Sequence, residues 1–198
     1  MPKGIPITEE DLQKKREEIF KATMHLFVEK GFNETSMREI GKTAGLGKST
    51  LYDYFSTKDE ILIFFVEKEV RLFSEIAGKV MDEDISASAK LHRILGGQLD
   101  HQLANRQLYL RLSFETQRLN FESQRKIQVL RHNYQDMLRR IVDEGIRSGE
   151  FRPVNSLLVI RGMLALLSSA IFTTRPTGAP GEMLDEAFDI LFQGIEVR

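Results

Sequence analysis

The chain of 198 residues contains no cysteine. This absence excludes disulfide bonds, cysteine nucleophiles and thiolate metal sites, and it is typical of proteins in a reducing compartment. Long hydrophobic runs are also missing, because the longest uncharged stretch of the most apolar region has 13 residues, 162–174. A membrane-spanning helix needs about 20 apolar residues, and residues 1–18 contain no apolar core of a signal peptide. These absences predict a soluble cytoplasmic protein.

Proline is scarce, with five in the chain and none in residues 7–152. Such a stretch favours helices, because no residue in it lacks a backbone N–H donor. Apolar residues recur at helical spacing near residues 19–27, 62–80 and 127–141, and Glu69 is the one polar break in the second stripe. No β-hairpin pattern is present. The sequence therefore predicts an all-α fold.

No charge of one sign dominates, since 28 Lys and Arg residues face 29 Asp and Glu residues, for a net charge of −1. This balance excludes a globally basic protein but leaves room for a local basic face. Hydrophobic residues make up 41% of the chain and charged residues 29%, which is typical of a globular protein and not of a disordered one.

Capping residues mark the ends of several helices. Thr8, followed by Asp11, opens the first helix, and residues 36–39 and 57–60 have the pattern of capping boxes, in which a hydroxyl and a glutamate each accept from a backbone N–H at the other position. The pair Gly96 and Gly97 is expected to bend or divide a helix. Further N-cap asparagines and helix-terminating glycines are predicted at Asn120, Asn155, Gly31, Gly45 and Gly149.

The most informative segment is residues 32–60, FNETSMREIGKTAGLGKSTLYDYFSTKDE. Its capping signals predict two short helices, over residues 36–44 and 47–54, with Gly45 in the turn between them. Two short helices joined by a glycine turn and preceded by an amphipathic helix are the pattern of a helix-turn-helix. The second short helix carries polar and aromatic side chains around an apolar one: Lys48, Ser49, Thr50, Tyr52 and Tyr54 around Leu51.

These side chains suit DNA, because hydroxyl and lysine donors reach phosphates and base edges, and tyrosine rings contact thymine methyl groups. Lys58 lies where it can hold a flanking phosphate. The alternative is a solvated helix with two tyrosines packed in a core. The local charge favours DNA binding modestly. Residues 35–58 contain four basic residues and two acidic ones, a balance of 4 − 2 = +2: Arg38, Lys42, Lys48 and Lys58 against Glu39 and Asp53.

Residues 14–62 closely resemble the DNA-binding half of the tetracycline-repressor (TetR) family of bacterial transcription regulators. The resemblance depends on the elements T-S-x-x-x-I, A-G-L and K-x-T-L-Y-x-Y-F at the family's spacing. The residues that carry it are Phe27, Lys30, Gly31, Phe32, Thr35, Ser36, Met37, Ile40, Ala44, Gly45, Leu46, Lys48, Thr50, Leu51, Tyr52, Tyr54, Phe55 and Lys58.

The resemblance implies an N-terminal three-helix DNA-binding domain and a C-terminal helical domain for ligand binding and dimerisation. Domain limits at residues 1–57 and 58–198 are predicted. The resemblance implies phosphate contacts at the first short helix, major-groove contacts at the second and backbone contacts beyond it; these DNA-binding residues are Thr35, Ser36, Lys48, Ser49, Thr50, Tyr52, Tyr54 and Lys58. Three residues depart from the family pattern, Gly41, Gly47 and Asp53. Phosphates repel the Asp53 carboxylate, although it could accept from a cytosine amine, and Asp53 is left out of the contact set.

An interpretation as an enzyme finds little support. Residues 41–49 resemble a phosphate-binding loop, but the interval between the two glycines is one residue too long and no hydrophobic strand precedes it. No two of the four histidines have i, i+4 spacing, and no serine, histidine and acid set suggests a catalytic triad. We therefore expect no enzyme activity, no metal and no cofactor. Two other classes remain open, a helical carrier with a vestigial DNA domain and a small helical enzyme.

The rest of the chain is expected to sense a ligand and to dimerise. A helix over residues 58–80 shares residues with both domains, so a ligand that shifts its tilt moves the DNA-binding helix. An apolar effector pocket among the helices is predicted, although any single residue there is expected more often as plain core than as a ligand contact. Two arginines in apolar helices need an acidic partner, from the protein or from an effector. The candidate effector-binding residues are Phe65, Tyr109, Arg111, Phe114, Tyr134, Met137, Arg161 and Met163.

Two strongly apolar helices, over about residues 156–172 and 183–196, flank the loop at 173–182. Pairing them with their copies gives a four-helix interface about a two-fold axis, an arrangement that the TetR resemblance also implies. The two DNA-binding helices then lie about 34–36 Å apart, in successive major grooves. The sequence thus predicts a homodimeric repressor that a small, largely apolar effector releases from a pseudo-palindromic DNA operator, with no membrane association.

Overall fold

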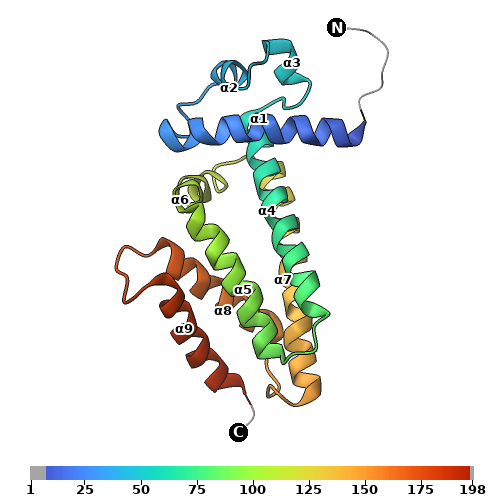
Figure 1. Ribbon diagram of the computed structural model, residues 1–198, viewed down its shortest axis with the longest axis vertical. Coiled ribbons are helices and arrows are strands. Elements are labelled where there is room, and N and C mark those ends of the chain that lie inside the picture. Colours follow the sequence, from blue (N-terminus) through green and yellow to red (C-terminus); the bar gives the residue numbers. More distant parts are fainter. Residues whose placement is uncertain (1–7, 197–198) are drawn as a thin grey trace. The chain divides into compact units, whose positions relative to one another are not determined.

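The computed structural model describes residues 8–196, and these residues form nine α-helices (Figure 1). Within them the one β-type pairing is an isolated bridge between Phe151 and Glu196, so the all-α prediction is confirmed. None of the helices in this part of the chain combines the length and the apolar character that crossing a bilayer requires.

The helices group into two compact units. Unit 1 comprises residues 8–66 and 107–126, and unit 2 comprises residues 67–106 and 127–196. The predicted domain limits, 1–57 and 58–198, divide the chain at a single point, whereas each compact unit combines two separate segments. The two divisions describe different things, so the domain limits stay a prediction. Their outermost residues, 1–7 and 197–198, lie outside the described part of the chain.

Unit 1 is built on three N-terminal helices. These are α1 (Glu9–Glu29), α2 (Met37–Thr43) and α3 (Lys48–Tyr52). The unit also contains the first part of α4 (Lys58–Met81), nearly all of α6 (Arg106–Glu115) and the start of α7 (Phe121–Ser148). Its core is largely apolar, and the side chains at its centre are Phe27, Ile40, Leu51, Phe55 and Phe64.

The predicted caps explain where these helices begin. Thr8 accepts from the Asp11 N–H, and Ser36 and Glu39 form the reciprocal capping box of α2. The second predicted capping box, at residues 57–60, is confirmed for Thr57 and wrong for Glu60. Thr57 accepts from the Glu60 N–H at 3.2 Å as expected, but the Glu60 carboxylate accepts from the N–H of Ser56 at 2.7 Å, one residue further out. The N-cap roles of Asn120 and Asn155 are confirmed.

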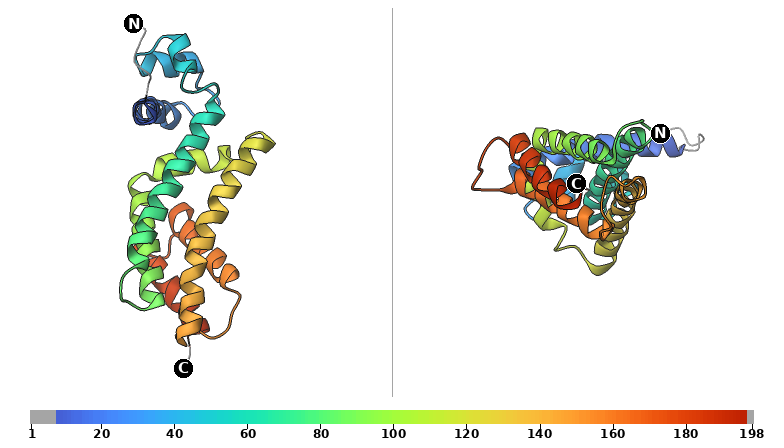
Figure 2. Two further views of the ribbon diagram at one scale, coloured as in Figure 1. Left: turned by 90° about the vertical axis from the view of Figure 1, so that its right-hand side faces the viewer. Right: turned by 90° about the horizontal axis from the view of Figure 1, so that it is seen from below.

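Unit 2 contains three helices that lie wholly or almost wholly within it, and the remaining parts of α4 and α7. The three helices are α5 (Ala87–Ala104), α8 (Ser156–Phe172) and α9 (Pro180–Ile195). Helix α5 lies against both α8 and α9, and these two pack on each other, as Figures 1 and 2 show. The side chains between them are buried and apolar, among them Leu91, Ile160, Met163, Leu167 and Phe188.

Two sequence predictions about unit 2 need correction. Gly96 and Gly97 do not divide a helix, because α5 runs through both of them, and the other outcome predicted for them, a bend, stays a prediction. The buried side chains on either side of the pair, Leu95 and Leu99, fix the helix in the core more strongly than two glycines weaken it. The last helix begins at Pro180 and not near residue 183, because proline suits a first helical position, whose N–H has no partner in the helix.

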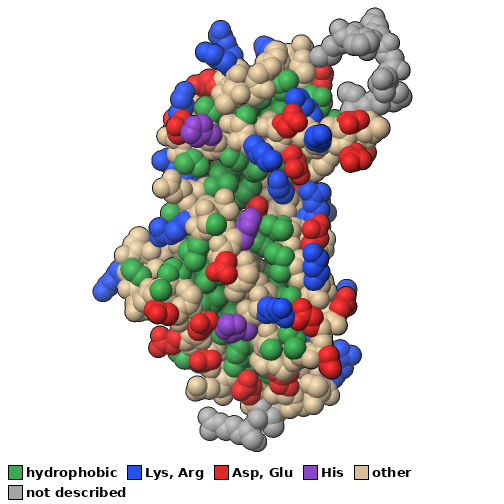
Figure 3. Space-filling model, viewed as in Figure 1, with side chains coloured by type: hydrophobic (Ala, Val, Ile, Leu, Met, Phe, Trp, Pro, Cys, Tyr) green, Lys and Arg blue, Asp and Glu red, His purple; other side chains and the backbone are tan. Residues whose placement is uncertain are grey.

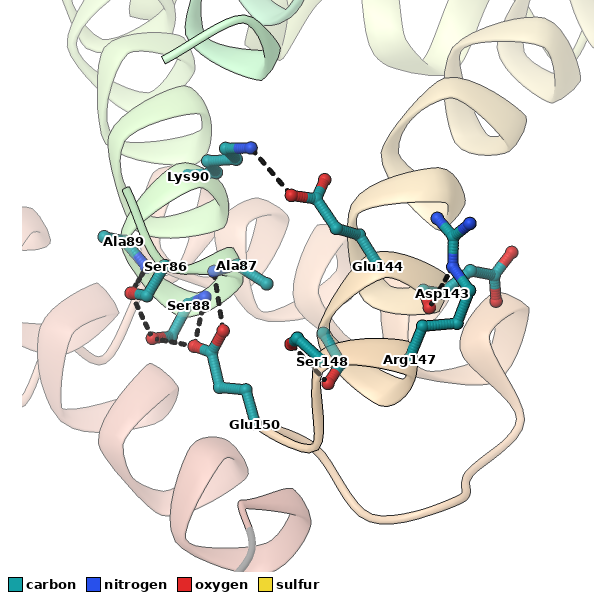
Figure 4. A network of polar contacts seen from close by, with 11 residues as sticks. Ser86, Ala87, Ser88, Ala89, Lys90, Asp143, Glu144, Arg147, Ser148 and Glu150 are labelled. Atoms are coloured by element: carbon teal, nitrogen blue, oxygen red, sulfur yellow. Dashed lines mark hydrogen bonds and ion pairs between the residues drawn. The ribbon is translucent and has the colours of Figure 1, made fainter. Parts of the chain in front are cut away.

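A polar network joins the start of α5 to the end of α7 and to the turn after α7 (Figure 4). Glu150 accepts from the backbone N–H groups of Ala87 and Ser88, at 2.7 and 2.8 Å, and so caps α5 from the turn after α7. Burial raises the pKa of Glu150, but these bonds and one from the Ser88 hydroxyl outweigh it and hold the pKa below its usual range. Nearby, the buried Lys90 donates to Glu144 at 2.9 Å.

Close packing beside this network requires glycine at position 145. A Cβ there would lie 2.4 Å from the Phe151 ring and 2.9 Å from the Ala87 Cβ. Both neighbours are buried, so neither has space to move aside. A methyl group at Gly145 therefore forces α7 away from α5.

We expect Gly145→Ala to lower the free energy of unfolding by about 1–3 kcal/mol, the usual cost of an overpacked core. The matched control is Gly96→Ala, because a Cβ at this helical position meets nothing within 4 Å. The control should stabilise by up to about 1 kcal/mol through helix propensity. Urea denaturation of both variants measures the difference, and equal effects would contradict the packing at residue 145.

Candidate nucleic-acid interface

Helices α2 and α3 meet in a tight turn. Gly45 takes a positive φ of 66°, as the sequence predicted, and the Leu46 N–H donates to the Gly41 carbonyl at 2.8 Å. A Cβ at Gly41 would lie 3.3 Å from the Leu46 carbonyl oxygen. The helices therefore cross so closely that position 41 has room only for a very small residue. The unusual Gly41 is thus compatible with the turn.

Helix α3 separates buried from exposed side chains within five residues. Leu51 is 1% exposed and anchors the helix in the core, whereas Tyr52 is 43% exposed and Lys48 and Ser49 are also exposed. The Lys48 ammonium lies 6.0 Å from the centre of the Tyr52 ring. The polar side of the helix thus faces outward and carries a cation, a hydroxyl and an aromatic ring.

The other predicted contact residues lie at the edges of this surface. Thr50 and Tyr54 are half-buried. Thr35 is buried, and its hydroxyl donates to the Gly31 carbonyl at 2.7 Å. The exposed Ser36 hydroxyl donates to the Glu39 carboxylate at 2.8 Å within the capping box of α2. Hydroxyls already bound in this way stabilise the fold, so a role of these two residues toward phosphate stays a prediction.

Lys58 folds back onto the turn after α1. Its ammonium donates to the carbonyl oxygens of Phe32 and Asn33 at 2.6 and 3.2 Å and lies 4.8 Å from the centre of the Phe32 ring. The lysine therefore ties the start of α4 to the end of α1. Its predicted contact with phosphate also stays a prediction.

Arg16 on α1 supports α3, and sequence reasoning missed it. Its guanidinium lies 4.7 Å from the ring centre of Phe55 and 5.3 Å from that of Phe64, so one cation covers two buried aromatic rings. The signal was present, because Arg16 precedes Phe20 by one helical turn on the stripe that α1 buries. This contact holds the Phe55 ring, three residues after the end of α3, against α1.

An ion pair joins α1 to α2. The Lys30 ammonium donates to the Glu39 carboxylate at 2.6 Å. This bond and those from the Ser36 N–H and hydroxyl lower the pKa of Glu39 to about 2. Glu39 therefore both caps α2 and holds it against the end of α1.

The segment 107–126 packs within unit 1, although it lies far along the chain. The Asn33 side-chain amide donates to the Glu115 carboxylate at 3.4 and 3.5 Å, and that of Asn120 donates to Asp59 at 3.3 Å. Helix α6 is thus fastened to the turn that precedes α2. No local pattern in the sequence indicated these contacts.

The predicted effector residues divide between the two units. In unit 1 the buried rings of Phe65 and Tyr109 meet edge to face at 5.6 Å, while Arg111 and Phe114 are exposed. In unit 2 Tyr134, Met137 and Met163 belong to the core, and Arg161 is exposed on α8. Both arginines therefore lie outside the apolar interior in which the sequence expected them to need a partner.

Unit 2 also contains a polar cluster in which sequence reasoning assigned Tyr134 to the effector site but not Gln98, His101 or Glu69. The Tyr134 hydroxyl donates to the Gln98 side-chain oxygen at 2.9 Å, and a 2.9 Å hydrogen bond joins His101 Nε2 to Glu69. Burial raises the pKa of Glu69, although His101 opposes the shift. The signal was Glu69 itself, the polar break in the apolar stripe of α4.

Two family models match the chain. Residues 19–63 match the model of bacterial regulatory proteins of the tetR family, and residues 84–195 match that of the tetracyclin repressor-like C-terminal domain. The chain belongs to the TetR family. It is a transcriptional regulator and not an enzyme, and the resemblance seen in residues 14–62 is confirmed.

Known proteins and solved structures are similar to this chain over most of its length. The fatty acid metabolism regulator protein of Bacillus subtilis is 27% identical over 147 residues, which cover 74% of this chain and 76% of the relative. The crystal structure of the TetR-family regulator PfmR from Thermus thermophilus is 26% identical, with a TM-score of 0.73 over 90% of this chain and 99% of that one. The structure of FadR from Bacillus subtilis in complex with stearoyl-CoA is 21% identical, with a TM-score of 0.79 over 91% and 99%.

The low pKa of Glu39 predicts how the stability of this TetR-family protein depends on pH. Because folding lowers the pKa from 4.5 to about 2, ionised Glu39 stabilises the folded state fully above pH 4.5, and this stabilisation is lost as the pH falls toward 2. We expect wild type to exceed Glu39→Gln in stability at pH 7 and the difference to shrink between pH 5 and 3.

Urea denaturation at a series of pH values measures this difference. The control is Glu67→Gln, which removes an exposed carboxylate of α4 outside the capping box. A difference between wild type and Glu39→Gln that stays constant from pH 7 to pH 3 would mean that the Lys30–Glu39 pair does not stabilise the fold.

Proposed function

We propose that this protein is a homodimeric repressor of the cytoplasm that binds a pseudo-palindromic operator through α3 and is released from it by an acyl-CoA. The outward polar face of α3, with Lys48, Ser49 and Tyr52, is the observation that carries the proposal. Side chains of this kind on a recognition helix contact phosphates and base edges in the major groove. Thr35, Ser36, Thr50, Tyr54 and Lys58 complete the proposed contact set at its edges.

Two similar proteins support the choice of an acyl-CoA as the proposed effector. A relative that matches three quarters of the chain regulates fatty acid metabolism, and a structure with the same fold binds stearoyl-CoA. Within unit 2, the apolar core with the candidate residues Tyr134, Met137 and Met163 suits an acyl chain, and the exposed Arg161 suits the phosphates of coenzyme A. Within unit 1, Phe65, Tyr109, Arg111 and Phe114 stay candidate effector residues of their own.

Two helices are suited to carry the response to α3. Helix α4 is continuous from Lys58 to Met81 and contributes residues to both units. Within unit 1, α6 holds the turn before α2 through the bond between Asn33 and Glu115. A ligand that favours another arrangement of these helices by about 1–3 kcal/mol changes operator affinity about 5- to 150-fold.

The test begins with a footprint of genomic DNA by the purified full chain, with and without palmitoyl-CoA. We expect protection of a pseudo-palindromic site that palmitoyl-CoA abolishes and coenzyme A alone does not. A helical carrier would bind palmitoyl-CoA and protect no DNA, and an enzyme would convert it. Either result would exclude the proposed repressor.

Variants of α3 then test the contacts on the protected site. Lys48→Ala should weaken operator binding about 10-fold or more and lower the salt dependence of affinity, because a released phosphate contact removes about one counterion. Tyr52→Ala should weaken binding by a similar factor. The control is Lys79→Ala, which removes an exposed lysine from the unit 2 part of α4. Wild-type affinity of both α3 variants would remove the contact assignment.

The proposed dimer uses α8 and α9. Leu158 on α8 is 67% exposed and Ile190 on α9 is 68% exposed, so each helix presents a large apolar side chain outside the core of unit 2. Figure 3 shows hydrophobic side chains among the charged ones over the part of unit 2 that contains these helices. A two-fold axis that pairs both helices with their copies buries such side chains in a four-helix interface.

Leu158→Glu and Ile190→Glu should each raise the dissociation constant of the dimer about 100-fold or more, because an unpaired carboxylate in an apolar interface is costly. The matched control is Val129→Glu on α7, where the native side chain is 51% exposed. Sedimentation velocity across a concentration series reports the oligomeric state. The proposed interface fails if the α8 and α9 variants remain as dimeric as the control.

A further inference from the structure

Helices α8 and α9 carry charges of opposite sign. Helix α8 contains a single charged residue, Arg161, and it is exposed. Helix α9 contains no basic residue, and its acidic residues are all exposed: Glu182, Asp185, Glu186 and Asp189. Since the proposed dimer forms through these two helices, the charge of each helix is complementary to that of the helix it would meet on a second copy.

Three of the four acids of α9 are directed elsewhere within the subunit. The Glu182 carboxylate accepts from the Ala179 N–H at 3.0 Å at the start of the helix, and Asp185 lies 2.9 Å from His92 Nε2 on α5. Asp189 lies one turn after Asp185 and lines a surface hollow together with His92, so it also faces α5. Glu186 is the acid that remains for a partner outside the subunit.

Glu186 and Arg161 each lie beside an exposed apolar side chain. On α9, Glu186 precedes Ile190 by four residues, so the two share a face of the helix. On α8, Arg161 follows Leu158 by three residues and shares a face with it in the same way. Both apolar side chains are exposed and belong to the proposed dimer interface. Each helix thus presents one apolar side chain and one charge together.

The charged residue of α8 lies near the point where α8 meets α9 (Figure 1). A Cβ at Gly162, the residue after Arg161, would lie 3.8 Å from Leu191 Cδ1, and Leu191 follows Ile190. Despite this closeness, neither Arg161 nor Glu186 forms an ion pair within residues 8–196. Both charges are therefore available to a second copy.

Two-fold symmetry makes this arrangement self-complementary. Any contact between α8 of one copy and α9 of the other occurs twice in the dimer. A contact between Leu158 and the partner's Ile190 brings Arg161 toward Glu186 of the partner subunit. The planar guanidinium fork suits a carboxylate, and water screens such a pair less beside an apolar contact than in free solution. A surface with a base at position 186 would instead meet Arg161 with a like charge, which is costly.

We infer that Arg161 and Glu186 of the partner subunit form an ion pair across the dimer and select a second copy of this chain as the partner. This inference rests on the proposed dimer and names the charges that determine its specificity. The pair forms in the dimer without effector. The phosphates of coenzyme A, which also suit Arg161, would compete with the partner's Glu186 for the same guanidinium.

Charge reversal in the full chain tests the pair. Arg161→Glu and Glu186→Arg each bring two like-charge contacts into the homodimer, so each should raise its dissociation constant about 100-fold or more. The matched control is Asp189→Arg, the same reversal on the side of α9 that faces α5, and it should dimerise as wild type does. Sedimentation velocity across a concentration series measures all three, and circular dichroism of each variant reports whether the helical fold is intact.

Mixing the two variants separates the ion pair from a general loss of the interface. A heterodimer of Arg161→Glu with Glu186→Arg contains two pairs of opposite charge, whereas neither homodimer contains any. Native mass spectrometry of an equimolar mixture should therefore show heterodimers and almost no homodimers. The double variant Arg161→Glu/Glu186→Arg restores both pairs within one chain and should dimerise nearly as tightly as wild type.

The outcomes distinguish the ion pair from the dimer itself. If both reversals leave the dimer as tight as wild type, or if neither mixing nor the double variant restores it, the ion pair is overturned and the dimer through Leu158 and Ile190 stands. If wild type is monomeric at every concentration, the proposed dimer fails and the ion pair fails with it.

Discussion

The burial of Leu51 is the constraint on which the presentation of α3 depends. A helix of five residues does not persist in water by itself, because nucleation costs more than so few hydrogen bonds return. Helix α3 therefore exists because Leu51, which is 1% exposed, is buried in the core of unit 1. Because Leu51 points into the core, the helical repeat places Lys48, Ser49 and Tyr52 on the exposed side of α3.

Several contacts of unit 1 serve this constraint rather than contact with DNA. Arg16 covers the Phe55 ring at the end of α3, and Lys58 bonds the carbonyl groups after α1. The pair of Lys30 and Glu39 fixes α2 on α1. Each of these three cations is engaged within the protein. Because Lys58 is one of them, the local charge count of +2 overstates the free positive charge available to DNA, and geometry has the larger part in affinity.

The sequence predicted what local rules determine. Capping residues indicated the starts of α1, α2 and α8, and positive φ angles at Gly31, Gly45 and Gly149 agree with the predicted ends. Local rules failed where packing decides. Two glycines suggested a break in α5 that the buried Leu95 and Leu99 override. The bond between Asn33 and Glu115 joins residues 82 positions apart, so no pattern within one helix announces it.

The polar side chains of unit 2 show how a largely apolar core accommodates buried amide and hydroxyl groups. The buried cluster around Phe73, Ile94 and Leu138 is apolar, and Tyr134 belongs to it. A leucine at position 98 would leave the buried Tyr134 hydroxyl without the Gln98 oxygen that accepts from it. Folding therefore favours an amide at position 98, because a buried polar group costs free energy when its hydrogen-bond partner is removed.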